Sequence, residues 1–255
     1  MAYMDNKDLA NTQISERREK EIGEAVSKVM EAVDAAAKGR PVRVIAATKT
    51  RDVGEVMAAI RGGIKVIGEN RVQELEEKMP IISAECQKAG ISISAHLIGQ
   101  LQKNKIAKVL PLVDCIESVE SFDKAQEISE RVPGGKLLDI YLEVNESGEE
   151  SKSGFHPDEV LPLIEKIGEF PNIRVKGLMT IPPISQKNGD NVKYFQKIYN
   201  ISVDIIALLG DNGMAKYLSM GMSDDFADAI ACGSTMIRVG TAIFGARDYS
   251  KLHQT

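Results

Sequence analysis

Residues 42–68 read VRVIAATKTRDVGEVMAAIRGGIKVIG and contain two short apolar runs on either side of a segment with helical spacing. Residues 42–47 form a short apolar, β-branched run, which is typical of a buried strand. Residues 53–60 carry apolar side chains at helical spacing and run into Gly62 and Gly63, which indicates a helix and its end. Residues 64–68 are again short and apolar. A strand, a helix and a second strand in this order predict a parallel sheet with crossover helices.

The same alternation continues along the chain. The predicted strands cover residues 42–47, 64–68, 91–98, 113–119, 137–144, 175–179, 217–220 and 234–239. The predicted helices cover residues 53–60, 72–88 (with Pro80 as a point where it could break), 102–110, 122–131, 157–167, 191–209 and 224–231, with a short one after Gly240. Eight such units fit an α/β fold of the closed (β/α)8 type, a TIM barrel. The alternative is an open doubly wound sheet, which usually has fewer strands or an antiparallel edge.

The residues before this pattern predict one additional helix. Apolar side chains recur at three-to-four spacing between Ile14 and Val33, and Gly39 and Pro41 mark the helix end. We therefore expect residues 1–41 to form an N-terminal helical extension packed on the barrel, and residues 42–255 to form the barrel itself. Because no linker or low-complexity tract divides the chain, we expect a single domain.

Composition excludes several classes of function. The 255 residues have a net charge of −5 and a sequence pI of about 5.4, which argues against binding to nucleic acid or an anionic membrane. The chain contains no Trp and only 5% aromatic residues, so a platform for stacking bases is not expected. The first twenty residues are polar and charged, unlike a signal peptide, and no apolar run approaches the roughly 20 residues of a spanning helix.

The three cysteines indicate the compartment. Cys86, Cys115 and Cys232 lie far apart, and an odd number cannot all pair within one chain. Buried thiols in a reducing compartment are the simplest interpretation. We therefore expect a cytoplasmic protein.

In a closed barrel, functional residues come from the carboxyl ends of the strands. The ends of the last two predicted strands and the loops after them contain small and hydroxylic residues: Ser219, Gly221, Ser223, Gly240 and Thr241. Glycines let backbone N–H groups approach an anion, hydroxyls add donors, and a helix that begins near Asp224 adds its positive end. The two loops together predict a phosphate site, whereas the alternative is ordinary turns with Ser223 and Asp224 as a helix cap.

Lys49 follows the first predicted strand, so its side chain should reach the barrel mouth. A partly desolvated lysine has a lowered pKa and can form a Schiff base with an aldehyde. A solvated or salt-bridged lysine is commoner, but a lysine opposite a phosphate site suits a phosphorylated aldehyde, either a sugar phosphate or pyridoxal phosphate. Arg238 favours the second, because the pyridine nitrogen of that cofactor needs an Asp or Arg partner. An ion pair between Arg238 and Glu143 is the alternative.

No metal site is predicted. His96 falls near the end of the third predicted strand, and no second His or Cys is spaced to share a metal with it, so packing in the core or at the rim is expected. His156 is expected to be a helix cap or a surface group. The acidic run of Glu74, Glu76 and Glu77 indicates a solvated helix face.

Seven stretches of the chain carry a resemblance to a known family. They are AATKT (46–50), IGEN (67–70), HLIGQLQKNK (96–105), LEVNESGEESKSG (142–154), GLMTIPP (177–183), LSMGMSDD (218–225) and GSTMIRVGTAIFGAR (233–247). These stretches resemble the pyridoxal phosphate homeostasis proteins (the YggS or PROSC family), which in turn resemble the barrel domain of alanine racemase. Gln100 stands where that family often has Pro, and Lys103 where it often has Ser.

The resemblance implies a complete cofactor site. Lys49 would carry pyridoxal 5′-phosphate as a Schiff base, Arg238 would face the pyridine nitrogen, and Asn70 would lie near the cofactor. The phosphate would be held by residues of the last two loops: Ser219, Ser223, Gly240 and Thr241. The resemblance gives no clear role to Lys152, which we expect to be a solvated loop lysine.

The expected function is binding rather than catalysis. An arginine beside the pyridine nitrogen disfavours its protonation and weakens the cofactor as an electron sink. The second acid/base group that alanine racemase takes from a separate β domain has no counterpart before the sequence ends. We therefore expect a protein that holds, buffers or delivers pyridoxal phosphate in vitamin B6 homeostasis, with its standing as an enzyme open. The alternatives are a weak pyridoxal phosphate-dependent amino-acid racemase and, less favoured, a cofactor-free Schiff-base aldolase. The expected partners are the cofactor and apo-enzyme clients, without nucleic acid or membrane, and the expected state is a monomer.

Overall fold

The strands form a closed parallel barrel in the computed structural model, which describes residues 8–149, 153–184, 187, 189–210 and 216–246. The strands in order are β1 (Arg43–Ala47), β2 (Val66–Glu69), β3 (Ser94–Leu97), β4 (Cys115–Val119), β5 (Leu138–Glu143), β6 (Ile173–Met179), β7 (Tyr217–Ser219) and β8 (Met236–Val239). Each strand pairs with the next one, and β1 also pairs with β8, with Ile45 opposite Arg238. This last pairing closes the barrel and excludes the open sheet.

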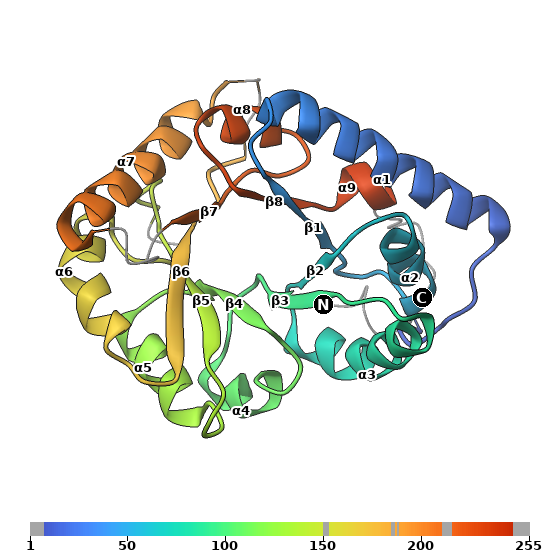
Figure 1. Cartoon of the computed structure of the whole chain (residues 1–255), viewed down its shortest axis with the longest axis horizontal. Coiled ribbons are helices and arrows are strands. Elements are labelled where there is room, and N and C mark those ends of the chain that lie inside the picture. The colour runs from blue at the N-terminus through green and yellow to red at the C-terminus, as the bar shows by residue number, and fades with distance from the viewer. Residues whose placement is uncertain (1–7, 150–152, 185–186, 188, 211–215, 247–255) are drawn as a thin grey trace, which may run out of the picture.

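The helices surround the barrel and alternate with the strands (Figure 1). They are α1 (Glu16–Ala37), α2 (Val53–Arg61), α3 (Val72–Ala89), α4 (Ile106–Val109), α5 (Phe122–Arg131), α6 (Pro157–Gly168), α7 (Val192–Leu209), α8 (Phe226–Ala231) and α9 (Thr241–Phe244), with a 3₁₀ turn, η1 (Lys103–Lys105), before α4. The TIM barrel expected from the sequence is therefore confirmed.

Two helices differ in detail from the prediction. The segment expected to form one helix over residues 102–110 is divided between η1 and the four-residue α4. Helix α3 passes through Pro80 without ending. Pro80 lies on the exposed side of α3, where water can bond to the backbone carbonyl that loses its N–H donor.

Helix α1 lies along the outside of the barrel against α2, α8 and α9 (Figure 1). The Ser15 side chain caps its first turn by accepting from the Arg18 N–H, and Lys38 ends it in the left-handed conformation. Arg18 is the main polar link to the barrel, because it bridges Glu55 of α2 at 2.6 Å and the Phe244 carbonyl of α9 at 2.7 Å. The boundary at residue 41 between an extension and the barrel stays a prediction.

The strand period of two divides the buried side chains into two layers. One face of each strand packs against the helices in the main core. The other face fills the barrel interior with a smaller apolar cluster, whose members are Ile45, Val66, Cys115, Tyr141, Met179 and Met236. Two residues further along β4, β5, β7 and β8, on the same interior face, the side chains are polar. The barrel thus has an apolar floor and a polar upper half at the carboxyl ends of its strands.

Among the helices in the described ranges, none combines the length and the apolar character needed to cross a membrane.

Candidate functional site

Arg238 forms the centre of the polar upper half. Arg238 is 4% exposed and belongs to β8. One terminal nitrogen, Nη1, donates to the Ser219 carbonyl at 2.7 Å and to the Ser219 hydroxyl at 2.6 Å, and Nη2 donates to the Thr180 carbonyl at 2.7 Å. Burial lowers the pKa of Arg238, and the negative charges of Glu117 and Glu143 oppose that shift. The predicted alternative for Arg238 was an ion pair with Glu143, whereas its hydrogen bonds go to β7 and to the end of β6.

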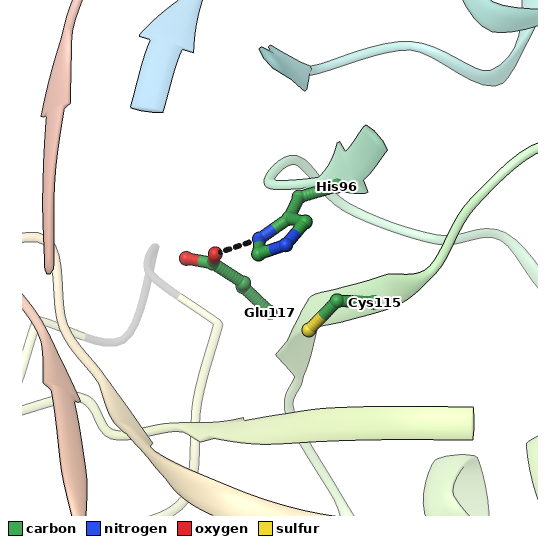
Figure 2. Close-up of side chains that lie close together, drawn as sticks. All are labelled: His96, Cys115 and Glu117. Carbon is green, nitrogen blue, oxygen red and sulfur yellow. Dashed lines mark hydrogen bonds and ion pairs between the residues drawn. The ribbon is translucent and has the colours of Figure 1, made fainter. Parts of the chain in front are cut away.

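Glu117 extends this network across the interior to β3. Its Oε2 accepts from the Ser219 hydroxyl at 2.6 Å, and its Oε1 lies 2.6 Å from His96 Nδ1 (Figure 2). Burial raises the pKa of Glu117, but the hydrogen bond from His96 and the charges of His96 and Arg238 outweigh burial, so the net shift is downward. The carboxylate is therefore ionised, and a continuous chain of contacts joins His96, Glu117, Ser219 and Arg238.

The structure corrects one expectation about His96. The sequence offered no residue spaced to share a metal with it, yet Cys115 and Glu117 lie beside it, because His96 pairs in register with Cys115 on the neighbouring strand. Their ligand atoms all lie within 4.8 Å of one another. Burial raises the pKa of the Cys115 thiol far above its usual range, so the thiol stays protonated. Both oxygens of Glu117 already have partners. His96 and Glu117 thus belong to a buried hydrogen-bond network.

Glu143 is the second carboxylate of the upper half. It ends β5, and burial raises its pKa to about 7, against the lowering effect of the Arg238 charge. It also lines a cavity of about 290 Å³ whose other lining residues are Asn70, Ile98, Gly99, Gln100, Val144, Asn145, Ser153 and Ile181. A carboxyl group that titrates near neutral pH at the mouth of a barrel is a functional-site feature that the sequence alone did not show.

The raised pKa of Glu143 predicts how stability depends on pH. Because the folded carboxyl binds its proton up to a pH of about 7, whereas the unfolded one releases it near 4.5, the folded state holds more protons in this interval. Stability from this group is therefore present below pH 4.5 and is lost as the pH rises, by on the order of 1 kcal/mol per pH unit near pH 6. We expect Glu143→Gln to remove this slope.

Urea unfolding of the wild type and of Glu143→Gln between pH 5 and pH 8 measures the difference directly. Taking the difference between the two proteins cancels the contribution of every other titrating group. Identical pH dependence of the two unfolding free energies would show that Glu143 is ionised across the range.

The predicted lysine lies at the same end of the barrel. Strand β1 pairs with β2 on one side, with Ala47 opposite Gly68, and with β8 on the other side. Lys49 follows two residues after β1, so Asn70 and Gly240 extend from the two strands that flank it. The structure thus brings the predicted attachment residue between the other predicted cofactor contacts.

Asn70 has a feature that points to a ligand. Its Oδ1 atom is buried, and among the described residues it has no hydrogen-bond partner. A Cβ atom on Gly99 would collide with the Asn70 backbone, so glycine is needed where the loop after β3 passes Asn70. An unpaired buried acceptor on the wall of a cavity fits a ligand that brings a hydroxyl or an ammonium donor.

The two predicted phosphate loops contact each other. The Ala242 N–H donates to the Ser223 hydroxyl at 3.3 Å, which joins the loop after β7 to the first turn of α9. Gly221 adopts a positive φ of 98°, and a Cβ atom there would lie 2.6 Å from Ala229. Asp225, rather than Ser223 or Asp224, occupies the cap position of α8. The alternative of Ser223 as a helix cap is therefore not what the structure shows.

The remaining predicted positions are placed as follows. Thr241 begins α9 and is exposed. The Ser219 hydroxyl contacts Glu117 and Arg238, so in this arrangement it orients the arginine, and its role toward a phosphate stays a prediction. His156 caps α6, as expected. Lys152 lies outside the described residues.

Sequence reasoning missed a buried charged cluster below Lys49. Glu74 was expected on a solvated face together with Glu76 and Glu77, but it is 1% exposed and bonds Lys78, which is equally buried. Glu76 and Glu77 are exposed as expected. The available signal was the spacing, because Glu74 and Lys78 fall four residues apart within the apolar stripe of the predicted helix.

Comparison with known proteins identifies relatives over most of the chain. Residues 24–248 match the family described as alanine racemase, N-terminal domain. A pyridoxal phosphate homeostasis protein from Haemophilus influenzae is 37% identical over 210 residues, which cover 82% of this chain and 86% of that protein. The human protein of the same name is 35% identical over 247 residues, covering 90% of this chain and 88% of its own length.

Solved structures that are similar to this chain over most of its length include proteins of the same kind. A crystal structure of an unknown protein from Bifidobacterium adolescentis has a TM-score of 0.88 at 46% identity and covers 93% of this chain and all of its own. PipY of Synechococcus elongatus, solved with pyridoxal phosphate bound, has a TM-score of 0.75 at 27% identity and covers 88% of this chain and 100% of its own. An alanine racemase from Clostridium difficile, with a TM-score of 0.64 at 14% identity, shows the shared fold alone.

The barrel, the lysine at the end of its first strand and the extent of these matches lead to one conclusion: this chain belongs to the family of pyridoxal phosphate homeostasis proteins, within the larger alanine racemase N-terminal domain family.

Proposed function

We propose that this protein binds pyridoxal 5′-phosphate at the carboxyl end of the barrel and holds, buffers or delivers it. The observation that carries the proposal is the position of Lys49 between Asn70 and the Gly240–Thr241 turn. The relatives at 35–37% identity that bear the homeostasis name, and the solved PipY structure with the cofactor, support it.

The residues present fit the cofactor. Asn70 Oδ1 is a buried acceptor without a partner among the described residues, and pyridoxal phosphate carries a ring hydroxyl that can donate to it. Lys49 supplies the ε-amine to which an aldehyde can become attached. The turns after β7 and β8 supply the hydroxyls of Ser223 and Thr241 for a phosphate. Such a cofactor, when bound, supplies an electrophilic ring that can stabilise negative charge on an attached amino acid.

Arg238 determines how strong that chemistry can be. Its guanidinium is fixed by Ser219 and Thr180 and keeps its positive charge, because Glu117 and Glu143 lie near it. A ring nitrogen held against this charge resists protonation, since two positive charges repel each other. Arg238 therefore favours storage of the cofactor over vigorous catalysis.

Equilibrium dialysis of the purified protein against pyridoxal phosphate tests the proposal. We expect one molecule bound per chain, with a change in the absorption spectrum of the cofactor. Transfer of the bound cofactor to a pyridoxal-dependent apo-enzyme tests delivery, and turnover assays with D- and L-amino acids separate storage from racemisation. Absence of binding would contradict the proposal, and rapid racemisation would contradict the storage role.

The phosphate turns give a second test. Thr241→Val keeps the shape of the side chain but removes its hydroxyl, and a hydrogen bond to a charged group contributes about 1.5–3 kcal/mol, so affinity should fall about tenfold or more. Thr241→Ser, which keeps the hydroxyl, is the matched control. Dialysis of both variants against pyridoxal phosphate measures the effect, and equal retention by the wild type and Thr241→Val would remove Thr241 from the phosphate site.

The proposal also includes the compartment, the oligomeric state and the client proteins. Free cysteines, among them the buried Cys86 and Cys115, suit the cytoplasm. The expected state is a monomer, which analytical ultracentrifugation measures. Apo-enzymes that depend on pyridoxal phosphate are the expected clients, since they are the proteins that would take up a delivered cofactor.

A further inference from the structure

The turn that carries Lys49 has an unfavourable backbone conformation. Thr50 adopts a φ of 66°, in the left-handed region that β-branched residues rarely enter. The turn also contains a hydrogen bond of 3.0 Å from the Arg51 N–H to the Thr48 carbonyl. A strained conformation of this kind persists only where the surrounding structure imposes it. Because Thr50 is next to Lys49, the contacts that impose this conformation also fix the backbone beside Lys49.

Lys78 of α3 holds both ends of that turn. Its ammonium group donates to the Thr48 carbonyl at 3.0 Å and to the Arg51 carbonyl at 3.1 Å. These two carbonyls lie on either side of Lys49 in the chain. A single nitrogen atom thus fixes the backbone before and after the proposed attachment residue.

Two acids complete the arrangement, and we call Lys78, Glu69 and Glu74 the Lys78 cluster. Glu74 Oε2 accepts from the Thr50 N–H at 2.8 Å and from Lys78 at 3.0 Å. Glu69 Oε1 accepts from the Thr48 hydroxyl at 2.6 Å and forms an ion pair with Lys78. Thr48, Thr50 and Arg51 are therefore each bonded directly to the cluster.

Burying the three charged side chains of the Lys78 cluster costs free energy, so stability alone does not explain the cluster. The side chains of Lys78, Glu69 and Glu74 are 1%, 2% and 1% exposed. Removing charges from water costs more than a buried ion pair usually returns, and apolar residues of similar volume often stabilise a fold as well. The cluster's bonds to the backbone of the turn are what apolar side chains could not replace.

We propose that Lys78 is a positioning residue for Lys49, which fixes the turn so that the Lys49 ε-amine is presented to the aldehyde of pyridoxal phosphate. This inference rests on the proposed function. Lys78 itself touches the turn and acts through Lys49. The cofactor's ring and phosphate are expected to contact Asn70, Arg238 and the turns after β7 and β8, none of which is among the hydrogen-bond or ion-pair partners of Lys78. The two kinds of contact can therefore be separated experimentally.

The experiment compares two ligands that differ only at the reacting carbon. Pyridoxal 5′-phosphate carries an aldehyde, whereas pyridoxine 5′-phosphate carries an alcohol in its place and cannot bond to an amine in the same way. Dissociation constants for both are measured by equilibrium dialysis on the wild type and on Lys78→Met. Lys88→Met is the matched control, because Lys88 lies on the same helix with a side chain that is 73% exposed.

We expect Lys78→Met to weaken binding of pyridoxal phosphate about tenfold or more, because a turn without its Lys78 bonds must be ordered when Lys49 bonds to the aldehyde, and ordering a loop on binding costs affinity. Binding of pyridoxine phosphate should be unchanged. Lys88→Met should change neither constant. Equal loss of both ligands would show that Lys78 only supports the fold, and unchanged binding of both would also overturn the proposal. A wild type that binds neither compound would instead contradict the proposed function itself.

A second variant covers the case in which Lys78→Met does not fold. The double substitution Lys78→Met with Glu69→Gln keeps the net charge of the cluster and leaves an acceptor for the Thr48 hydroxyl. Gln is a close match to protonated Glu69, since burial raises the pKa of Glu69 to about 7 against the lowering charge of Lys78. The same selective loss of pyridoxal phosphate is expected, and a loss shared equally by the two ligands would again overturn the proposal.

Discussion

Arg238→Glu is expected to unfold the protein or to lower its free energy of unfolding by about 3–5 kcal/mol, because it removes a buried cation and leaves buried anions uncompensated. The substitution deletes the bonds to Ser219 and Thr180 and places a third carboxylate near Glu117 and Glu143. Arg238→Met removes the charge without adding another, so it should cost less than Arg238→Glu.

Urea unfolding at neutral pH measures this effect. Arg17→Glu is the matched control, since the Arg17 side chain is 89% exposed and the same substitution there should change the unfolding free energy by no more than about 0.5 kcal/mol. If Arg238→Glu and Arg17→Glu were equally stable, the guanidinium would not be compensating Glu117 and Glu143. A spectrum of the bound cofactor that is the same in Arg238→Met and the wild type would show that Arg238 is structural.

Lys49→Arg is expected to abolish lasting retention of pyridoxal phosphate. Arginine keeps the positive charge but cannot form the covalent bond to an aldehyde, so only the contacts to ring and phosphate are left. We expect the affinity to fall on the order of 100-fold, which corresponds to about 2.7 kcal/mol. Most of the cofactor should then be lost when the protein passes through a gel-filtration column.

Lys65→Arg is the matched control for this change. Lys65 is exposed just before β2, and the same substitution there should leave retention unchanged. Retention of one cofactor per chain by Lys49→Arg after gel filtration would place the attachment elsewhere. Loss by both variants would point to a general effect on the fold.

The fold followed from local patterns. Short apolar runs and helical spacing lie within single segments, and eight repeats of them leave few arrangements other than a closed barrel. The predicted elements differ from the structure where the local preference of a residue conflicts with its packing in the fold. Pro80 could end α3 by its own chemistry, but the helix continues because Pro80 faces solvent.

The site was predicted only in part. Lys49, Asn70, Ser219 and Arg238 were expected at the barrel mouth because each lies at or near the end of a strand, and every strand of a parallel barrel ends on the same side. The contacts of these residues across the barrel interior could not be predicted from their positions at strand ends. Glu117 meets Ser219 although 102 residues separate them, and only the closed barrel with its register brings β4 and β7 to a common interior.

The Lys78 cluster was hidden for a different reason. Charged residues on an amphipathic helix are usually solvated, so Glu74 was predicted to lie on a solvated face together with Glu76 and Glu77. Their burial depends on how α3 packs over the turn at Lys49, which is a tertiary contact. A lysine and a glutamate within an otherwise apolar stripe were the one local sign that this helix face was not exposed.

Borohydride reduction of the wild-type protein loaded with pyridoxal phosphate, followed by peptide mapping, identifies the amine that holds the cofactor. Reduction converts a covalent bond between the cofactor and an amine into a stable pyridoxyl group that mass spectrometry can locate. We expect one pyridoxyl group per chain, on Lys49. A pyridoxyl group on another lysine, such as Lys65 or Lys152, with Lys49 unmodified, would contradict this expectation.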